Sequence, residues 1–236
     1  MRMSPPPPNR YAALEAIRTI LDFHEQQNFV LSGHSYGTIV VAHALRDPHL
    51  QSRITNVLFV DPIPFLLHLP SVAYNFLYRE PKTANEWQLW YFASRDPDIA
   101  RTLSRHFFWA ENILWKDELK DRQVGVILSG RDQIVDALEV WKYLTNTQEE
   151  GAPEFHWTGE GLDVYYYPEL DHATVFDTRK RREPLVEMVM RFARKTPADG
   201  SPNESSPGVE GNSSESTPLT RKGIQRSYLS TSIETR

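Results

Sequence analysis

The sequence of 236 residues predicts an α/β protein with a mostly parallel sheet and helices on both of its faces. Apolar, strand-like runs alternate along the chain with patterns of helical period, which is typical of this class. The strand-like runs are apolar throughout, as in strands that are buried on both faces. The hydrophobic fraction of 40% is enough for one sizeable core, so we expect one globular domain over residues 10–195.

The first predicted elements are a helix, a strand and a second helix. Asn9 can cap a helix over RYAALEAIRTILDFHEQQ (10–27), which is apolar at three- and four-residue spacing. The short run NFVLSG (28–33) predicts a strand, and TIVVAHALRDP (38–48) predicts a buried helix that its final Asp-Pro ends. The chain therefore turns sharply between a strand and a helix at residues 34–37.

Three further strands and two helices follow the same alternation. The strands are predicted at ITNVLFVDP (54–62), DRQVGVILSGRD (121–132) and GLDVYYYPELDH (161–172). Helical patterns follow the last two of them, at QIVDALEVWKYL (133–144) and EPLVEMVMRFAR (183–194). Parallel strands joined by helices imply right-handed crossover connections.

Three segments fall outside this alternation. Residues 1–9 form a Pro-rich N-terminal segment. Residues 62–120 are crowded with large aromatic side chains, which makes them too apolar for a linker, and we expect them to form a helical cap. Residues 196–236 are rich in Ser and Pro and have almost nothing to bury, so we expect a disordered tail.

Composition excludes several classes of function. A net charge of −5 gives no basic footprint for nucleic acid, so we expect no nucleic-acid partner. The absence of cysteine excludes disulfides and thiolate catalysis, and we predict no metal site and no cofactor. There is no apolar signal-peptide region and no apolar run long enough for a membrane span, which favours a cytoplasmic or peripheral protein.

The turn after the first strand carries the pattern G-x-S-x-G, in LSGHSYG (31–37). Glycines on both sides of Ser35 let the backbone bend tightly, so that the serine hydroxyl is presented at the carboxyl edge of the sheet. The backbone N–H of Tyr36, at the start of the next helix, would face an oxygen that becomes negative during acyl transfer. Ser35 is therefore a candidate nucleophile, and Tyr36 a candidate oxyanion-hole donor.

Two more residues follow strand ends in the order that a catalytic triad needs. Asp132 lies in SGRDQIV after the third strand, and His172 lies in ELDHATVF after the fourth. With the serine turn, these motifs resemble the α/β-hydrolase superfamily, in which the chain order is Ser, acid, His. The resemblance to its serine esterases and lipases implies that Ser35 is the nucleophile, His172 the general base and Asp132 the residue that orients the histidine.

The acid and the pocket have alternatives. Asp61, after the second strand, is a rival acid, because some members of the superfamily use that strand end. We expect His34, Phe65, Trp90 and Phe108 to line a substrate pocket under a lid formed by the cap, which suits an apolar ester or acyl substrate. The aromatics could instead form only the cap's own core, and a peripheral membrane contact through the cap, at PFLLHLP (64–70), is a further expectation.

The resemblance covers residues 10–195 but only the second half of the superfamily's fold. The strands that precede the serine turn in the superfamily, and the loop with the second oxyanion-hole donor, have no counterpart here. We therefore expect the strand before Ser35 to lie at or near a sheet edge, where it could pair with a partner strand. Two functions remain open: a serine esterase or lipase, or a non-catalytic or truncated hydrolase-like interaction protein. Peptidases and other acyl-transfer enzymes share the same motif residues.

Overall fold

The computed structural model describes residues 8–147 and 155–195 of the chain. Most of the predicted Pro-rich segment and the whole predicted tail (196–236) lie outside the described residues. Within these ranges the predicted α/β class is confirmed, because a single sheet is connected and covered by helices. No helix in the described ranges combines the length and the apolar character needed to cross a bilayer.

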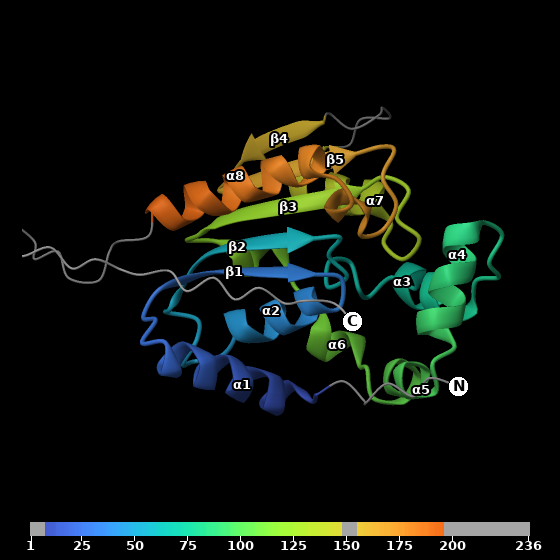
Figure 1. Ribbon diagram of the computed structural model, residues 1–236, viewed down its shortest axis with the longest axis horizontal. Coiled ribbons are helices and arrows are strands. Elements are labelled where there is room, and N and C mark those ends of the chain that lie inside the picture. The colour runs from blue at the N-terminus through green and yellow to red at the C-terminus, as the bar shows by residue number, and fades with distance from the viewer. Residues whose placement is uncertain (1–7, 148–154, 196–236) are drawn as a thin grey trace, which may run out of the picture. The chain divides into compact units, whose positions relative to one another are not determined.

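In the part of the chain that the structure describes, the sheet has five strands in the order β1-β2-β3-β5-β4 (Figure 1). Four of them run parallel, and β4 pairs antiparallel with β5. The strands are β1 (Phe29–His34), β2 (Ile54–Val60), β3 (Gln123–Ser129), β4 (His156–Gly159) and β5 (Leu162–Tyr167).

The strand register brings the functional turns to one edge of the sheet. His34 at the end of β1 pairs with Val60 at the end of β2, and Val60 pairs with Ile127 of β3. The residues that follow β1 and β2, Ser35 and Asp61, are therefore neighbours across the sheet. Figure 1 shows β1 and β2 pointing toward the same side, where the helices α3 (Ser71–Ala73), α4 (Ala84–Leu89) and α5 (Pro97–Arg105) lie.

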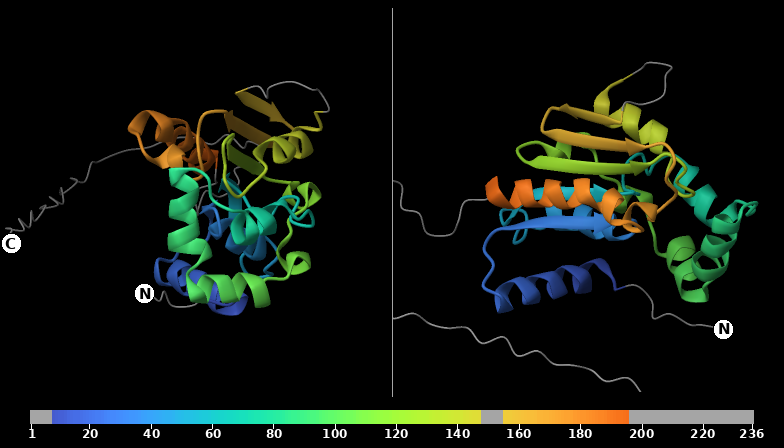
Figure 2. Two further views of the ribbon diagram at one scale, coloured as in Figure 1. Left: turned by 90° about the vertical axis from the view of Figure 1, so that its right-hand side faces the viewer. Right: turned by 45° about the horizontal axis from the view of Figure 1, so that its top comes forward.

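Helices cover both faces of the sheet, as the continuous apolar strands predict (Figure 2). Along β2, Phe59 faces one apolar cluster and Leu58 the other. The first cluster includes residues of α1, α2 and α7, and the second is closed by α8. The helices are α1 (Arg10–Phe23), α2 (Gly37–Leu45), α7 (Ala137–Thr145) and α8 (Arg179–Lys195).

Residues 62–120, here called the insertion, form short helical elements between β2 and β3. They are α3 (Ser71–Ala73), a π-helix (Tyr74–Tyr78), α4 (Ala84–Leu89), a second π-helix (Trp90–Ser94), α5 (Pro97–Arg105), α6 (Trp109–Asn112) and a 3-10 helix (Lys116–Leu119). The two ends of the insertion join the first apolar cluster, here called the main core, where Phe65, Leu67 and Leu114 are buried.

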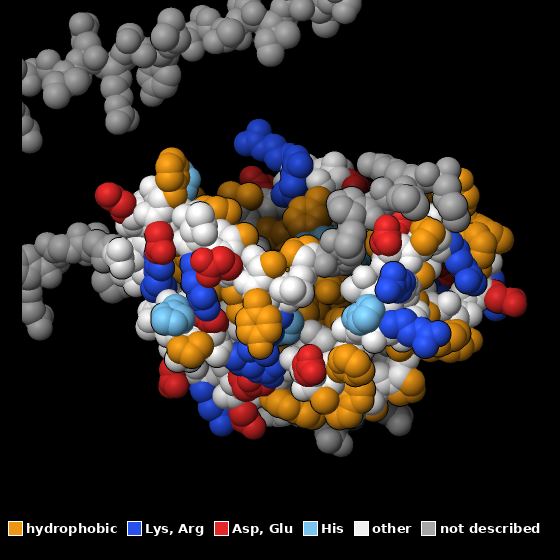
Figure 3. All heavy atoms as spheres, turned by 90° about the horizontal axis from the view of Figure 1, so that it is seen from below, with side chains coloured by type: hydrophobic (Ala, Val, Ile, Leu, Met, Phe, Trp, Pro, Cys, Tyr) orange, Lys and Arg blue, Asp and Glu red, His pale blue; other side chains and the backbone are white. Residues whose placement is uncertain are grey.

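Between those ends, the insertion exposes many of its large side chains. Figure 3 shows hydrophobic side chains interspersed with Lys and Arg on the right-hand part of the surface. Exposed aromatics of the insertion include Tyr78, Tyr91 and Phe92. In PFLLHLP, by contrast, Phe65 and Leu67 are buried, so this stretch does not present a continuous apolar surface. Membrane contact through the insertion stays a prediction.

The structure differs from the sequence prediction at several elements. Strand β4 was not predicted, because its four residues HWTG carry only a weak strand pattern. The helix predicted to begin at 133 begins at Ala137, since the chain first makes a turn that Asp132 holds. The predicted edge position of β1 is confirmed. A bare edge would be expected to expose its apolar residues, but these are half-buried, because Val30 packs with the cluster under α8 and Leu31 with the other cluster.

Candidate active site

The turn after β1 holds Ser35 in a left-handed backbone conformation, with φ of 52°. Such a conformation is uncommon for a residue other than glycine and marks a turn that the surrounding structure enforces. The N–H of Ser35 donates to the carbonyl of Val60 (3.0 Å), and the buried hydroxyl of Thr38 donates to the carbonyl of Ser35. The same Thr38 oxygen accepts from the N–H of Ile63 (3.2 Å), so one side chain ties the turn to the chain after β2.

The two glycines of the motif have different roles. A Cβ at position 33 would lie 2.6 Å from Cγ2 of Val41 and 2.8 Å from the carbonyl oxygen of Gly37, closer than folded proteins allow. A Cβ at position 37 would meet no atom within 4 Å. Gly33 is therefore required by close packing of the turn on α2, whereas Gly37 is not.

Replacing Gly33 with alanine is expected to lower the free energy of unfolding by about 1–3 kcal/mol, because the added methyl group overpacks the turn. Gly37→Ala is the matched control and should leave stability unchanged or raise it, since alanine favours the first turn of α2. Denaturant unfolding of both variants measures the difference. Equal stability of the two would contradict the assigned role of Gly33.

His172 lies between Ser35 and Asp132. Its Nε2 is 2.8 Å from Oγ of Ser35, and its Nδ1 is 2.8 Å from Oδ2 of Asp132. The side chain of His172 is 11% exposed and that of Asp132 is 1% exposed. The structure thus brings together the three residues that the sequence singles out, in a continuous chain of hydrogen bonds from hydroxyl to carboxylate.

The carboxylate of Asp132 is fixed by its own loop. While Oδ2 faces His172, Oδ1 accepts from the backbone N–H groups of Ile134 (2.7 Å) and Val135 (3.0 Å). Side chains that bond to nearby backbone in this way form turns rather than helices, which is why α7 starts later than its apolar pattern suggests. The rotamer of Asp132 is therefore fixed by hydrogen bonds within its own loop, independently of the imidazole.

Burial and charge act on His172 in opposite directions. Burial disfavours the imidazolium, but the hydrogen bond and charge of Asp132, aided by the charge of Asp61, outweigh it and raise the pKa of His172 above its usual value. The surroundings therefore stabilise the protonated ring. That is the form an imidazole takes after it accepts a proton from a serine hydroxyl.

Asp61, the rival acid, makes a different contact. Its Oδ2 accepts from the backbone N–H of Ala173 (2.8 Å), next to His172, while the Nδ1 of His172 bonds to Asp132. Both Asp61 and Ala173 have left-handed φ values, 45° and 66°. Burial alone would raise the pKa of Asp61, but the His34 ring, the charge of His172 and the Ala173 N–H together lower it. The geometry gives Asp61 a place as an ionised carboxylate that holds the histidine loop.

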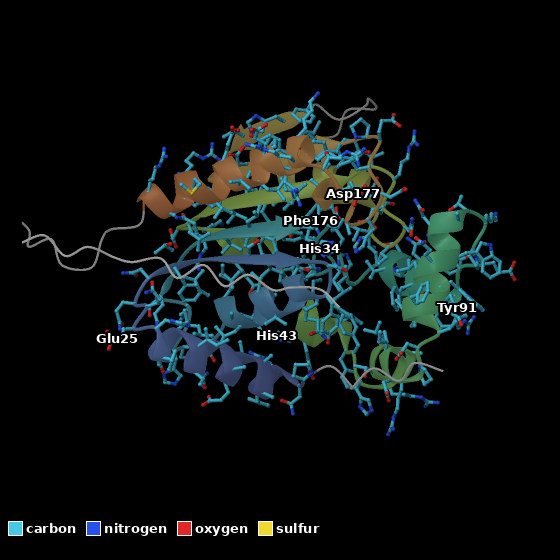
Figure 4. All side chains as sticks on the ribbon, in the orientation of Figure 1. Glu25, His34, His43, Tyr91, Phe176 and Asp177 are labelled. Carbon is cyan, nitrogen blue, oxygen red and sulfur yellow. The ribbon has the colours of Figure 1, made fainter. Side chains whose placement is uncertain are left out.

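His34 stands beside this carboxylate. Its Nε2 is 3.6 Å from Oδ2 of Asp61, and its ring centre is 5.1 Å from those of His172 and Phe176. Figure 4 shows His34 and Phe176 next to each other at the ends of the strands. Two buried polar atoms here, Nε2 of His34 and Oδ1 of Asp61, have no hydrogen-bond partner among the described residues.

The other residues predicted for the pocket lie in separate places. Phe65 is 1% exposed and packs against Phe59, so it acts as a core residue; it also lines a cavity of about 380 Å³ between residues 65–74 and 135–140. Trp90 packs with Trp87 and Arg95 inside the insertion.

Phe108, the fourth predicted pocket residue, is 59% exposed. The adjacent Phe107 contacts Tyr36 instead, with ring centres 6.4 Å apart. Phe107 and Phe176 are thus the phenylalanines that border the serine turn and the histidines. Phe176 lies within the ELDHATVF segment, so its closeness to His172 in sequence was the signal that could have identified it.

Three side chains of the insertion bond to the loops that carry Asp132 and His172. Asn75 donates to the carbonyl of Ile134 (3.0 Å), and Arg79 donates to the carbonyl of Gln133 (2.6 Å). Asn85 donates to the carboxylate of Asp171, the neighbour of His172. No local sequence pattern predicts these contacts, because they join residues more than 50 positions apart.

No protein-family model and no curated protein sequence matches the chain. Among solved structures, it is similar to a serine hydrolase from Cycloclasticus zankles at 14% identity and TM-score 0.49, over 83% of this chain and 76% of the other. It is similar to an alpha/beta hydrolase fold protein from Chitinophaga pinensis (12%, TM-score 0.47, 82% and 74%) and a carboxylesterase from Bacillus subtilis (14%, TM-score 0.46, 80% and 68%). At 12–14% identity and TM-scores below 0.5, these likenesses carry no argument about function.

Proposed function

We propose that the protein is a serine hydrolase that cleaves carboxylic esters through an acyl-enzyme intermediate. The observation that carries this proposal is the chain of two 2.8 Å hydrogen bonds from Ser35 through His172 to Asp132. A serine hydroxyl is a weak nucleophile unless a neighbouring imidazole accepts its proton. The buried carboxylate of Asp132 supports this step, since it holds the tautomer whose Nε2 lone pair faces the hydroxyl.

In the first half of the reaction, Oγ of Ser35 attacks the ester carbonyl carbon while Nε2 of His172 takes the hydroxyl proton. The carbonyl oxygen becomes an oxyanion, for which the backbone N–H of Tyr36 at the start of α2 is the proposed donor. His172 then gives its proton to the leaving alcohol, and the acyl group stays on Ser35. In the second half, water attacks the acyl-enzyme with the same histidine as base, which releases the acid and restores Ser35.

The surroundings of the site favour an apolar substrate. Phe176 packs edge-on against His34, and Phe107 lies against the ring of Tyr36, so aromatic rings border the residues before and after Ser35. Burial raises the pKa of the Tyr36 hydroxyl, in keeping with a neutral phenol in apolar surroundings. We infer that the acyl or alcohol part of the ester is apolar and that the insertion covers it as a lid.

Covalent labelling tests the nucleophile. A fluorophosphonate probe should label the folded protein at Ser35, and Ser35→Ala should remain unlabelled. Ser32→Ala is the matched control, because Ser32 is exposed on β1 and takes no part in the hydrogen-bond chain, so labelling should persist. Folded protein that stays unlabelled would contradict the enzyme proposal and leave a non-catalytic interaction role.

Substrate profiling then separates esters from amides. Hydrolysis of p-nitrophenyl esters of increasing chain length should exceed hydrolysis of matched p-nitroanilides, and the Ser35→Ala variant supplies the background rate for both. Faster release from the anilides would change the proposal from an esterase to a peptidase-type enzyme, with the same nucleophile.

A further inference from the structure

A second function is suggested by the cluster formed by His34, Asp61 and His172. Each of these residues offers one ligand atom, and the three atoms lie within 4.8 Å of one another. Two imidazoles and one carboxylate form a ligand set that zinc and related transition-metal ions prefer, whereas Mg²⁺ prefers oxygen ligands alone. We propose that these three residues form a binding site for a transition-metal dication, with Zn²⁺ as the best fit.

The distance between the ligand atoms of His34 and Asp61 is close to that expected for two ligands of a single metal ion. Zinc binds histidine nitrogen and carboxylate oxygen at about 2.0–2.2 Å, so two ligands of a tetrahedral zinc are roughly 3.3–3.5 Å apart. Nε2 of His34 and Oδ2 of Asp61 are 3.6 Å apart, which is too long for a hydrogen bond. Because the three ligand atoms lie within 4.8 Å of one another, the side chains must move inward to bring all three to coordination distance.

Within the described part of the chain, one candidate ligand atom of the cluster, and the second oxygen of the Asp61 carboxylate, lack hydrogen-bond partners, whereas Oδ2 of Asp61 and Nε2 of His172 bond to Ala173 and Ser35. Nε2 of His34 and Oδ1 of Asp61 are buried and have no hydrogen-bond partner among the described residues, although the Asp61 side chain is fully buried. Buried polar atoms normally find a partner, and an ion is one of the accepted explanations when they do not. The His34 side chain is 33% exposed, which gives a hydrated ion a route into the cluster.

His172 completes the site and links it to catalysis. A ligating histidine usually donates its second ring N–H to a carboxylate, and Asp132 stands 2.8 Å from Nδ1 in that position. Coordination at Nε2 takes the lone pair that would accept the proton of Ser35. Metal binding involves no oxidation or reduction, and the metal replaces the Ser35 hydroxyl as the partner of His172. We therefore expect the metal to inhibit hydrolysis reversibly, a consequence that rests on the proposed function.

Calorimetry with Zn²⁺ on metal-free protein tests the site without any assay of activity. We expect one Zn²⁺ per chain in the native protein and in Ser35→Ala, and no saturable binding of Mg²⁺. Co²⁺ should give the visible absorption of a four-coordinate site in the same proteins. Absence of saturable one-to-one binding of Zn²⁺ would overturn the proposal.

Ligand variants then locate the site. His34→Gln should weaken Zn²⁺ binding at least about tenfold, and Asp61→Asn should do the same. His49→Gln is the matched control, since His49 is exposed and lies outside the cluster, and it should bind like the native protein. If Asp61→Asn folds poorly, the His34→Gln variant alone decides the test. Unchanged affinity in His34→Gln, or an equal loss in His49→Gln, would overturn the assignment.

Probe labelling separates this proposal from the proposed function. Zn²⁺ should block fluorophosphonate labelling of the native protein, and EDTA should restore it. If metal-free protein is never labelled, the hydrolase proposal fails, and calorimetry still decides the metal site. If labelling occurs and saturating Zn²⁺ leaves it unchanged, the metal does not bind through His172, and the site as proposed here is wrong.

Discussion

Replacing Asp132 with asparagine is expected to lower the turnover of an activated ester by a factor on the order of 10⁴. Oδ2 of Asp132 is the atom that faces Nδ1 of His172, at 2.8 Å. An asparagine amide at the same place can present its NH₂ group to Nδ1, and the ring then carries its proton on Nε2, where it can no longer accept one from Ser35. Turnover measured with a p-nitrophenyl ester under saturating conditions reports this loss.

Asp61→Asn should cost far less, about tenfold, because it weakens one hydrogen bond worth about 1.4 kcal/mol and leaves the histidine tautomer unchanged. The bond in question joins Asp61 to the Ala173 N–H and acts on the position of the histidine loop. Asp177→Asn is the control for the loss of a carboxylate, since its side chain is 59% exposed and lies outside the hydrogen-bond chain. The reverse ranking of the Asp132 and Asp61 variants would move the acid role to Asp61.

The sequence alone could narrow the acid of the proposed triad to Asp132 or Asp61 but could not decide between them. Both aspartates follow a strand, so both are brought to the same edge of a parallel sheet, and chain order favours Asp132 without excluding Asp61. In the structure, Asp132 is the carboxylate that meets Nδ1 of His172, while Asp61 accepts from the N–H of Ala173. Both Asp61 and Ala173 have left-handed φ. Neither residue is a glycine, so the sequence gives no sign of these conformations.

The parallel strands could be predicted because each is a local run of buried apolar residues. Strand β4 could not, since four residues with little apolar character become a strand only by pairing with β5. The aromatic side chains of the insertion pose a related problem. Composition predicts that they pack against something, but burial of Phe65 in the main core and exposure of Phe108 follow from long-range contacts.

The insertion is bonded to the loops that carry Asp132 and His172, and this changes the expected effect of removing it. Phe65 and Leu67 belong to the main core, so deleting residues 64–109 is expected to unfold the protein rather than only to uncover a pocket. The informative changes are therefore single side chains. Arg79 is the strongest candidate, because it donates to the carbonyl of Gln133, next to Asp132, and also pairs with Glu86 at 3.4 Å.

Replacing both Arg79 and Asn75 with alanine is expected to slow labelling of Ser35 by a small fluorophosphonate about 10- to 100-fold, the loss typical of a catalytic group displaced by about 1 Å. Both side chains hold carbonyl oxygens of the loop at residues 133 and 134, and neither lies in the hydrogen-bond chain itself. Without them the loop can move away from His172 while the sheet remains intact. The rate of labelling, compared with the melting temperature of the same variant, measures the effect.

Arg101→Ala is the matched control, because Arg101 is an exposed arginine of α5 in the same insertion. Its labelling rate should equal that of the native protein. A different result would follow if the insertion acted only as a lid over bulky esters. The Arg79 and Asn75 double variant would then hydrolyse long-chain esters at an altered rate, while it reacted with the small probe at the native rate. That outcome would contradict a positioning role for these side chains, because a small probe needs the serine, the histidine and the acid in place but needs no wall for a long chain.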